Sequence, residues 1–330
     1  MTKAVSRRRV LAGLALAGPA WLGLARGATA QGAWPSQPVR IIVPFEPGGP
    51  ADAIARVVAA RLGEKMGQPF VVENRSGASS AIGTAVVARA KPDGYNLLLG
   101  TSAFSGNVAL GRPLTFDTRK DLAPIALMGV SPAFLMVSAT LPVRSVRELI
   151  DYVRQRPDGV TYASPGAGTF PHLAVEMFNL RAGTQMLHVP YRGTAPALTD
   201  MVTGRVQAMI SDTTGAMQHI QAGAIRVLAA AAGQRSDLLP EVPTLRESGL
   251  SDYAAESWFG LIGPAGVPAD IQDRLATAVA EVLAEPDATR RMRDIGSTPR
   301  SMKPAEFASY VARDIDQLTD VVRAADIKVD

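Results

Sequence analysis

Two glycine-rich loops contain the residues of this chain that are best suited to binding an anion. The first loop is Pro47–Asp52, which follows a strand-like run and precedes a helical pattern. Gly48 and Gly49 have no Cβ, so their backbone N–H groups can approach a ligand closely. Pro50 suits the first helical position, where free N–H groups and the helix dipole favour negative charge. Asp52 would be stabilised by the same dipole and could orient the loop.

A second loop of the same kind changes the interpretation of the first. No Gly-Lys-Ser/Thr follows the first pair of glycines, and G-x-G-x-x-G spacing is absent there, so a nucleotide site is not indicated. A plain strand-to-helix turn remains the alternative. The segment 164–169 again connects a strand to a helix, and it offers backbone and hydroxyl donors from Ser164, Gly166, Gly168 and Thr169.

A third candidate loop, Gly100–Ala103, also follows a predicted strand. Ligands of open α/β sheets bind at the carboxyl ends of the strands, which is where all three loops are expected. The sequence therefore suggests one ligand clamped between two α/β units. Trp258 and Phe259, in another predicted strand, could belong to the core or to the wall of a cleft.

The chain offers no set of catalytic residues. It has no cysteine, no G-x-S-x-G nucleophile motif, and only three histidines, of which no two are close in sequence. His172, early in a predicted helix, could act in catalysis, but no nucleophile is spaced with it, so a structural role or one behind the ligand contacts is favoured. Asp212 could accept hydrogen bonds from a ligand or cap a helix. Arg192 could pair with a ligand carboxylate or stay solvated. We therefore expect no catalytic residues, no metal site and no cofactor.

The basic charge of the chain lies in its first 30 residues. These residues carry +5, and subtracting +5 from the net charge of +4 leaves −1 for the remainder, which gives no case for nucleic acid as a partner. Ser6–Leu11 resembles a twin-arginine signal, an apolar stretch follows, and Ala28-Thr29-Ala30 is typical of a cleavage site. We expect export to the periplasm with cleavage after Ala30. Twin-arginine and general export remain alternatives, as does a retained N-terminal anchor.

Strand-like and helix-like patterns alternate along the rest of the chain. Its 330 residues are enough for two domains, and the β-α-β-α-β order predicts parallel strands with right-handed crossovers. Strands are predicted at 39–44, 70–73, 96–99, 134–138, 160–163, 186–189, 206–211, 226–230 and 258–262. Helices are predicted at 51–66, 80–90, 145–155, 170–181, 196–203, 216–222, 270–283 and 304–324. The two long C-terminal helices could pack on either domain.

Several longer segments together resemble the Bug-type, or tripartite tricarboxylate transporter, periplasmic substrate-binding proteins. The motifs that carry the resemblance are "WPSQPVRIIVPFEPGG", "VVENRSGASSAIGTAVVARAKPDGYNLLLGTSA", "LHVPYRGTAPALTDMVTG", "VPTLRESGL" and "ESWFGLIGPAGVP". Each motif is weak alone, but jointly they are specific. The resemblance runs from Trp34-Pro35 to the final helix.

The resemblance implies a two-lobed periplasmic-binding-protein fold of the Venus-flytrap type II class. Each lobe would be a mostly parallel sheet flanked by helices, with two crossover strands between the lobes. Residues 31–131 and 255–330 would form lobe 1 and residues 132–254 lobe 2. A small organic acid would bind in the cleft through backbone amides, hydroxyls and water. The protein, a monomer, would deliver this acid to the membrane permease without chemical turnover. Sensing instead of uptake, or an enzyme on the same scaffold, are the alternatives.

The expected ligand-binding residues come from the three loops and three further positions. They are Phe45, Pro47, Gly48, Gly49, Thr101, Ser102, Ala103, Ser164, Gly166, Ala167, Gly168, Thr169, His172 and Asp212. Two of the loop positions depart from the family pattern. Ala51 stands where the family often has a hydroxyl, and Ala167 where it often has asparagine. Each lost bond to a charged group would be worth roughly 1.5–3 kcal/mol. These departures point away from the typical dicarboxylate towards a monocarboxylate or a more apolar acid, with water in place of the lost donors as the alternative.

Overall fold

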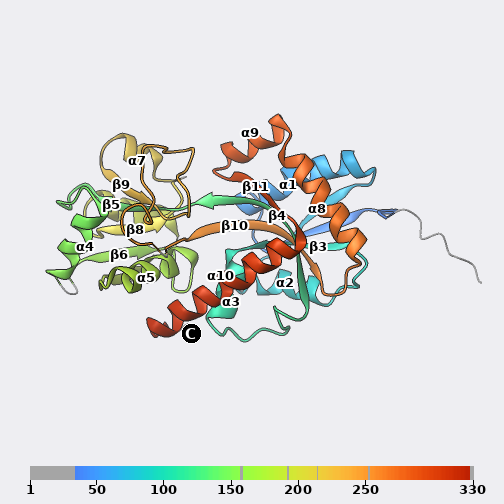
Figure 1. Ribbon diagram of the computed structural model, residues 1–330, viewed down its shortest axis with the longest axis horizontal. Coiled ribbons are helices and arrows are strands. Elements are labelled where there is room, and N and C mark those ends of the chain that lie inside the picture. The colour runs from blue at the N-terminus through green and yellow to red at the C-terminus, as the bar shows by residue number, and fades with distance from the viewer. Residues whose placement is uncertain (1–33, 157–158, 192, 214, 252, 328–330) are drawn as a thin grey trace, which may run out of the picture.

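The computed structural model describes residues 34–327 with the exception of 157–158, 192, 214 and 252 (Figure 1). The predicted leader, its cleavage site and Arg192 lie outside the described residues. Two separate β-sheets, each with helices around it, form two lobes that lie side by side (Figure 1). The two-lobed α/β fold predicted from the sequence is confirmed. Within the described residues, no helix is both long enough and apolar enough to cross a membrane.

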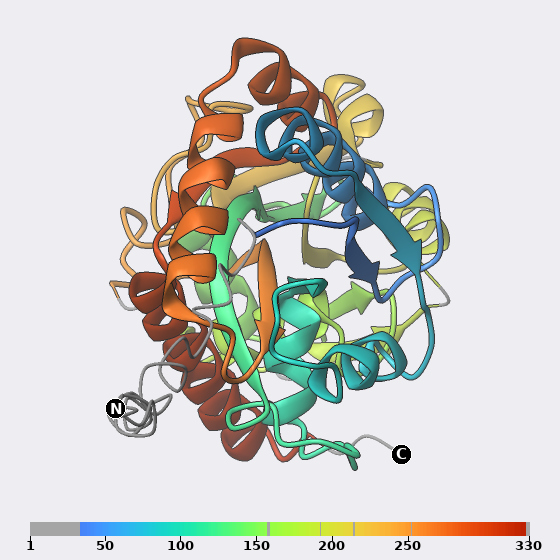
Figure 2. The same ribbon diagram turned by 90° about the vertical axis from the view of Figure 1, so that its right-hand side faces the viewer.

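The first lobe contains a six-stranded sheet with strand order β11-β4-β10-β3-β1-β2. Its strands are β1 (Val39–Val43), β2 (Phe70–Asn74), β3 (Asn96–Thr101), β4 (Leu122–Pro132), β10 (Glu256–Pro264) and β11 (Thr298–Met302). Its helices are α1 (Pro50–Met66), α2 (Ala81–Ala88), α3 (Ser102–Ala109), α8 (Ala269–Leu283), α9 (Pro286–Asp294) and α10 (Pro304–Ala324). Buried side chains of α1, α8 and α9 pack on one face of the sheet, and those of α2, α3 and α10 pack on the other (Figure 2).

The second lobe contains a five-stranded sheet with strand order β7-β6-β8-β5-β9. Its strands are β5 (Phe134–Ser138), β6 (Thr161–Ser164), β7 (Leu187–Pro190), β8 (Ala208–Ser211) and β9 (Ile225–Ala230). Its helices are α4 (Val146–Arg154), α5 (Phe170–Ala182), α6 (Thr194–Val202) and α7 (Met217–Gln221). Buried residues of α4 and α5 pack on one face of this sheet and those of α6 on the other.

Two crossover strands, β4 and β10, connect the lobes. They pair antiparallel from Glu256↔Pro132 to Pro264↔Leu122, and β4 leads directly into β5 of the second sheet. These returning strands explain why each sheet is mixed. The pairs β1–β2, β1–β3, β6–β7 and β6–β8 are parallel, as the β-α-β pattern predicts, whereas every pair with β4, β5 or β10 is antiparallel. The expectation of mostly parallel sheets therefore holds only for the part of each sheet that lies away from the crossover.

The last helix packs on both lobes. Phe307, Val311 and Ile315 of α10 belong to the core of the first lobe, whereas Val321 belongs to the core of the second. Leu318, between them, contacts Leu173 of α5. Figure 1 shows α10 running from the first lobe along the side of the second. The sequence did not decide on which lobe this helix packs. The structure shows that it packs on both. The proposed lobe boundaries remain a prediction.

Candidate ligand-binding cleft

A cleft of about 900 Å³ lies between the two lobes, and both glycine loops line it. Of the residues expected to bind the ligand, the cleft brings together Phe45, Pro47, Gly48, Gly49, Thr101, Ser102, Ala103, Ala167, Gly168, Thr169 and Asp212. Ala51, one of the two departures from the family pattern, also lines it, as does Ala167. The three loops meet here because each follows the carboxyl end of a strand, β1, β3 or β6.

Asp52 holds the first loop in place. Its carboxylate, which is only 3% exposed, accepts hydrogen bonds from Gly48 N at 3.0 Å, Arg56 Nε at 2.9 Å and Asn74 Nδ2 at 2.9 Å. These bonds, above all that from Arg56, lower the pKa of Asp52 to about 2 despite its burial. Asn74 also donates to the Phe45 carbonyl at 3.1 Å. The loop is therefore ordered before any ligand arrives, and the Gly48 N–H already has an acceptor.

The second loop has the same arrangement with a histidine in place of the aspartate. Gly168 N donates to His172 Nδ1 at 2.9 Å, again to a side chain four residues further along the chain. Thr169 Oγ1 donates to the Gly166 carbonyl at 2.7 Å, and the Ser164 hydroxyl lies 2.9 Å from the same oxygen. Gly168 has a φ of +74°, which favours glycine. Internal hydrogen bonds thus preform this loop as well.

Ser164 and Gly166 of the second loop, and His172 of α5, do not line the cleft. His172 is only 6% exposed, and its ring stacks on that of His188 with 4.0 Å between centroids. His188 Nε2 is in turn hydrogen bonded to Ser164 Oγ at 2.7 Å. Burial, followed by the charge of His188, lowers the pKa of His172 to about 4. In this structure these residues support the loop backbone.

Three helix N-termini converge on the cleft. Within the described chain, no side chain caps α1 after Gly49 or α5 after Thr169, whereas the Thr101 hydroxyl caps α3 by accepting from Ala103 N at 3.3 Å. The first turn of a helix has N–H groups without intrahelical acceptors, and its dipole favours an anion. The two uncapped N-termini, one from each lobe, are therefore suited to bind one anionic group between them.

Comparison with known proteins identifies the family of the chain. The sequence profile of the tripartite tricarboxylate transporter family receptor matches residues 54–327. This chain belongs to that receptor family. It is 34% identical to protein BugT of Bordetella pertussis over 90% of this chain and 91% of BugT. Among solved structures, it resembles R. palustris Rpa4515 with adipate (36% identity, TM-score 0.74, covering 89% of this chain and 99% of that one). It also resembles MatC of Rhodopseudomonas palustris with bound malate (32% identity, TM-score 0.70, covering 87% of this chain and 99% of that one).

The crossover strands supply three cleft residues of this receptor, of which the sequence singled out only Phe259. Successive residues of a strand point to opposite faces. Ser131 of β4, and Ser257 and Phe259 of β10, line the cleft. Ser257 Oγ is 3.0 Å from Ser102 Oγ, which connects the crossover to the start of α3. Phe259 is thus cleft wall, whereas its neighbour Trp258 is fully buried. Further lining residues that sequence reasoning missed are Ser79, Gly106, Asn107, Arg112, Phe170, Leu173, Ile295 and Leu318.

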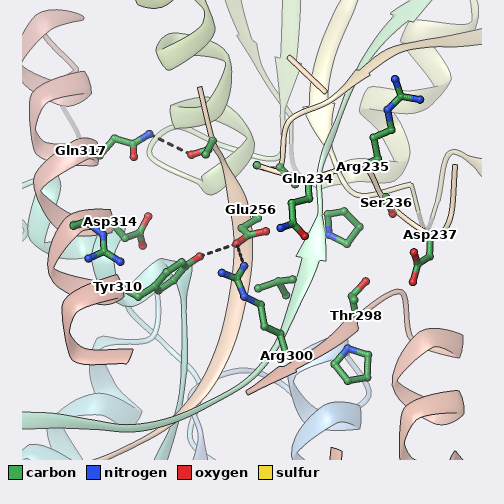
Figure 3. Close-up of a pocket in the computed structure, with 17 residues that line it drawn as sticks. Gln234, Arg235, Ser236, Asp237, Glu256, Thr298, Arg300, Tyr310, Asp314 and Gln317 are labelled. Atoms are coloured by element: carbon green, nitrogen blue, oxygen red, sulfur yellow. Dashed lines mark hydrogen bonds and ion pairs between the residues drawn. The ribbon is translucent and has the colours of Figure 1, made fainter. Parts of the chain in front are cut away.

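The opposite face of the crossover strands lines a second cavity of about 710 Å³ (Figure 3). Val130, Pro132 and Glu256 alternate with the cleft residues and line this rear cavity. The Glu256 carboxylate accepts from Arg300 at 2.8 Å and from the Tyr310 hydroxyl at 3.2 Å (Figure 3). The cleft and the rear cavity of this receptor therefore lie on opposite sides of the two strands that connect the lobes.

Proposed function

We propose that this receptor captures a small organic acid in the interlobe cleft outside the cytoplasm and delivers it to a tripartite tricarboxylate-type membrane permease. The observation that carries this proposal is the pair of uncapped helix N-termini, α1 and α5, that face one cleft from different lobes. A carboxylate bound between them would contact both lobes at once. The adipate and malate complexes of the two related proteins support a carboxylate as the ligand.

The proposal includes no chemical change of the ligand. Of the described residues that line the cleft, only Glu46 and Asp212 are acids, and no histidine is among them. Glu46 accepts a hydrogen bond from the Ser76 hydroxyl. General acid–base catalysis needs groups positioned at the reacting atoms, and the cleft wall shows no such pair. An enzyme on this scaffold, or a receptor used for sensing, remains the alternative.

Delivery to a permease requires that ligand binding changes the shape of the receptor. A ligand that contacts both lobes only when the cleft is closed shifts the equilibrium towards the closed form. We propose a hinge at the crossover strands β4 and β10, and a monomer as the working unit.

We also propose that the leader pattern of residues 1–30 directs export of the protein. Sequencing the N-terminus of the protein from the extracytoplasmic fraction should give Gln31 as the first residue. An intact leader in that fraction would contradict the cleavage.

A thermal-shift screen of small carboxylic acids, followed by calorimetry on the hits, tests the binding. We expect one site per chain and an affinity that is lost when the ligand's carboxylate is replaced by an amide. Matched acid and amide pairs separate recognition of the charge from recognition of the apolar part. Equal binding of acid and amide would contradict the anion site. Conversion of a bound acid, followed by NMR over hours, would instead favour the enzyme.

A further inference from the structure

Arg112 is the single cation among the described residues that line the cleft. It follows the C-terminus of α3, whose N-terminus lies at the proposed carboxylate site. The side chain comes from a position that no predicted motif covers, and the first carboxylate does not require it, because α1 and α5 already provide donors from both lobes. Arg112 therefore needs an explanation of its own.

Among the residues that the structure describes, the Nε of Arg112 has no hydrogen-bond partner. This Nε is buried from solvent, and none of the ion pairs between described residues includes Arg112. A buried donor without an acceptor is costly, more so when the group is charged. Arginine matches a carboxylate through two parallel N–H···O bonds. An unpaired arginine at a cleft wall is thus a binding site for an acid.

Its place in the fold separates this arginine from the loops. Ser102 and Ala103, then Gly106 and Asn107, line the cleft along one side of α3. At 1.5 Å per residue, Ser102 and Asn107 are about 8 Å apart along the helix axis. Arg112 lies beyond them, with its backbone N–H donating to the Asn107 carbonyl at 3.1 Å. The arginine is therefore at the far end of α3 from the helix N-termini.

Part of the cleft wall is apolar. Ala103, Phe170, Leu173 and Leu318 line the cleft, from α3, α5 and α10, and Leu173 and Leu318 cluster with Ala109 near the C-terminal end of α3. The amide of Asn107 does not compete for a ligand acid, because its Nδ2 already donates to the Ser79 carbonyl at 2.6 Å and lies 3.2 Å from Ser80 Oγ. The cleft thus combines loop donors, the Arg112 guanidinium and an apolar surface.

We infer that Arg112 binds a second acidic group of the ligand and so sets the receptor's preference for an elongated dicarboxylate over a monocarboxylate. The inference rests on the proposed function, because the first carboxylate must lie between α1 and α5. Ala51 and Ala167 remove side-chain donors near that first carboxylate, and on this ground the sequence allowed a monocarboxylate as the ligand. Arg112 supplies a donor at the other end of α3 instead.

Calorimetry with two pairs of acids of equal length tests the inference: adipate against hexanoate, and suberate against octanoate. The proteins are the wild type, Arg112→Gln, Arg112→Lys and the control Arg181→Gln. Arg181 is an exposed arginine near the end of α5 that does not line the cleft. Thermal unfolding of each variant checks that the fold is intact.

The wild type should bind at least one diacid more tightly than its monoacid. Arg112→Gln should weaken that diacid about ten- to a hundredfold, the value of one or two charge-assisted bonds, and leave the monoacid unchanged. Arg112→Lys should fall in between, because the charge stays while the planar fork is lost. Arg181→Gln should match the wild type.

Three outcomes would overturn the inference, and they differ in what they say of the proposed function. A wild type that binds both members of each pair equally leaves the carboxylate site standing and removes the role of Arg112. If Arg112→Gln loses the same affinity for the diacid and the monoacid, the arginine instead binds the first carboxylate or stabilises the fold. If no carboxylic acid binds in the preceding screen, the proposed function fails together with this inference.

Discussion

At the scale of single residues, the two lobes hold their glycine loops by the same device. In each loop a glycine N–H donates to a side chain four residues later, Asp52 for Gly48 and His172 for Gly168. The acceptor orders the loop without a ligand, so less entropy is lost on binding. The remaining N–H groups of the first helical turn stay available for the anion. Different residue types thus perform one structural task.

Gly48→Val should weaken ligand binding at least tenfold. Gly48 has a φ of +88°, where a β-branched side chain is strained by about 1–3 kcal/mol, so the loop must change shape. Gly223 is a matched control, because its φ is +73° and a Cβ there, as at Gly48, would meet nothing within 4 Å. Gly223→Val should lose similar stability and keep its affinity. Calorimetry and chemical denaturation measure both. Unchanged affinity in Gly48→Val would remove this loop from the site.

His172 makes stability depend on pH. Its pKa in the folded state, about 4, is lower than the ordinary value of 6.5 because of burial and the neighbouring His188. The folded state therefore favours neutral His172, whose Nδ1 can accept from Gly168. This contribution is complete above pH 6.5 and is lost as the pH falls towards 4, because the unfolded chain then binds more protons. The slope is at most about 1.4 kcal/mol per pH unit for one group.

His172→Gln tests this assignment, because glutamine stays neutral over the whole range. Its free energy of unfolding, measured by denaturant titration between pH 4 and 7, should rise less steeply with pH than that of the wild type. In His188→Gln the free energy of unfolding should also rise less steeply with pH than in the wild type, because burial lowers the pKa of His188 too. Identical pH profiles for the wild type and His172→Gln would contradict the prediction.

At the scale of elements, Asp52 connects three segments that form one wall of the cleft. It lies in the first turn of α1, accepts from the loop at Gly48, and accepts from Asn74 at the end of β2. The carboxylate is also favoured by the N-terminal end of the α1 dipole. One buried side chain thus fixes the angle between a strand, a loop and a helix.

Asp52→Ala should destabilise the protein by about 1–3 kcal/mol, because the Gly48 and Asn74 donors lose their acceptor in a buried place. Ligand affinity should fall as well. Asp151→Ala is the matched control, since Asp151 also pairs with an arginine four residues away but both side chains are exposed. Such a pair is worth well under 1 kcal/mol. Chemical denaturation compares the two variants, and equal losses would contradict the role of Asp52.

At the scale of the whole molecule, two strands and one helix connect the lobes. The crossover strands separate the ligand cleft from the rear cavity, so a bend that narrows one must widen the other. Helix α10 packs on both lobes, and Gln317 on it donates to the Ala254 carbonyl of the segment that leads into β10, at 3.2 Å. An ion pair between Arg293 of α9 and Asp237 joins the lobes at 3.4 Å. The proposed closure would have to shift these contacts.

Ligand binding should make the molecule more compact. Small-angle scattering with a saturating acid should show a smaller radius of gyration than the free protein, because the bound carboxylate connects α1 of one lobe to α5 of the other. Gly48→Val with the same concentration of acid is the control and should keep the radius of the free form. An unchanged radius with a confirmed tight ligand would contradict the hinge.

Local sequence signals predicted much of the fold. Alternating patterns placed β1 and α1 within one residue of their observed bounds, and Ser145 caps α4 by accepting from Glu148 N at 3.2 Å, as the capping-box pattern predicts. Four elements were not predicted: α3, β4, α9 and β11. Helix α3 contains Ser102, Ser105, Gly106 and Asn107, which are weak helix formers, and β4 is buried along most of its length and shows no alternation.

The sequence by itself determined the two glycine loops, the α/β order and the resemblance to a receptor family, because these depend on residues that are neighbours in the chain. The tertiary structure alone decided which of those residues line the cleft. It stacked His172 on His188 behind one loop, placed α10 on both lobes, and left the Nε of Arg112 at the cleft without an acceptor among the described residues. Such contacts depend on how two lobes with separate cores pack together, and no local propensity encodes that packing.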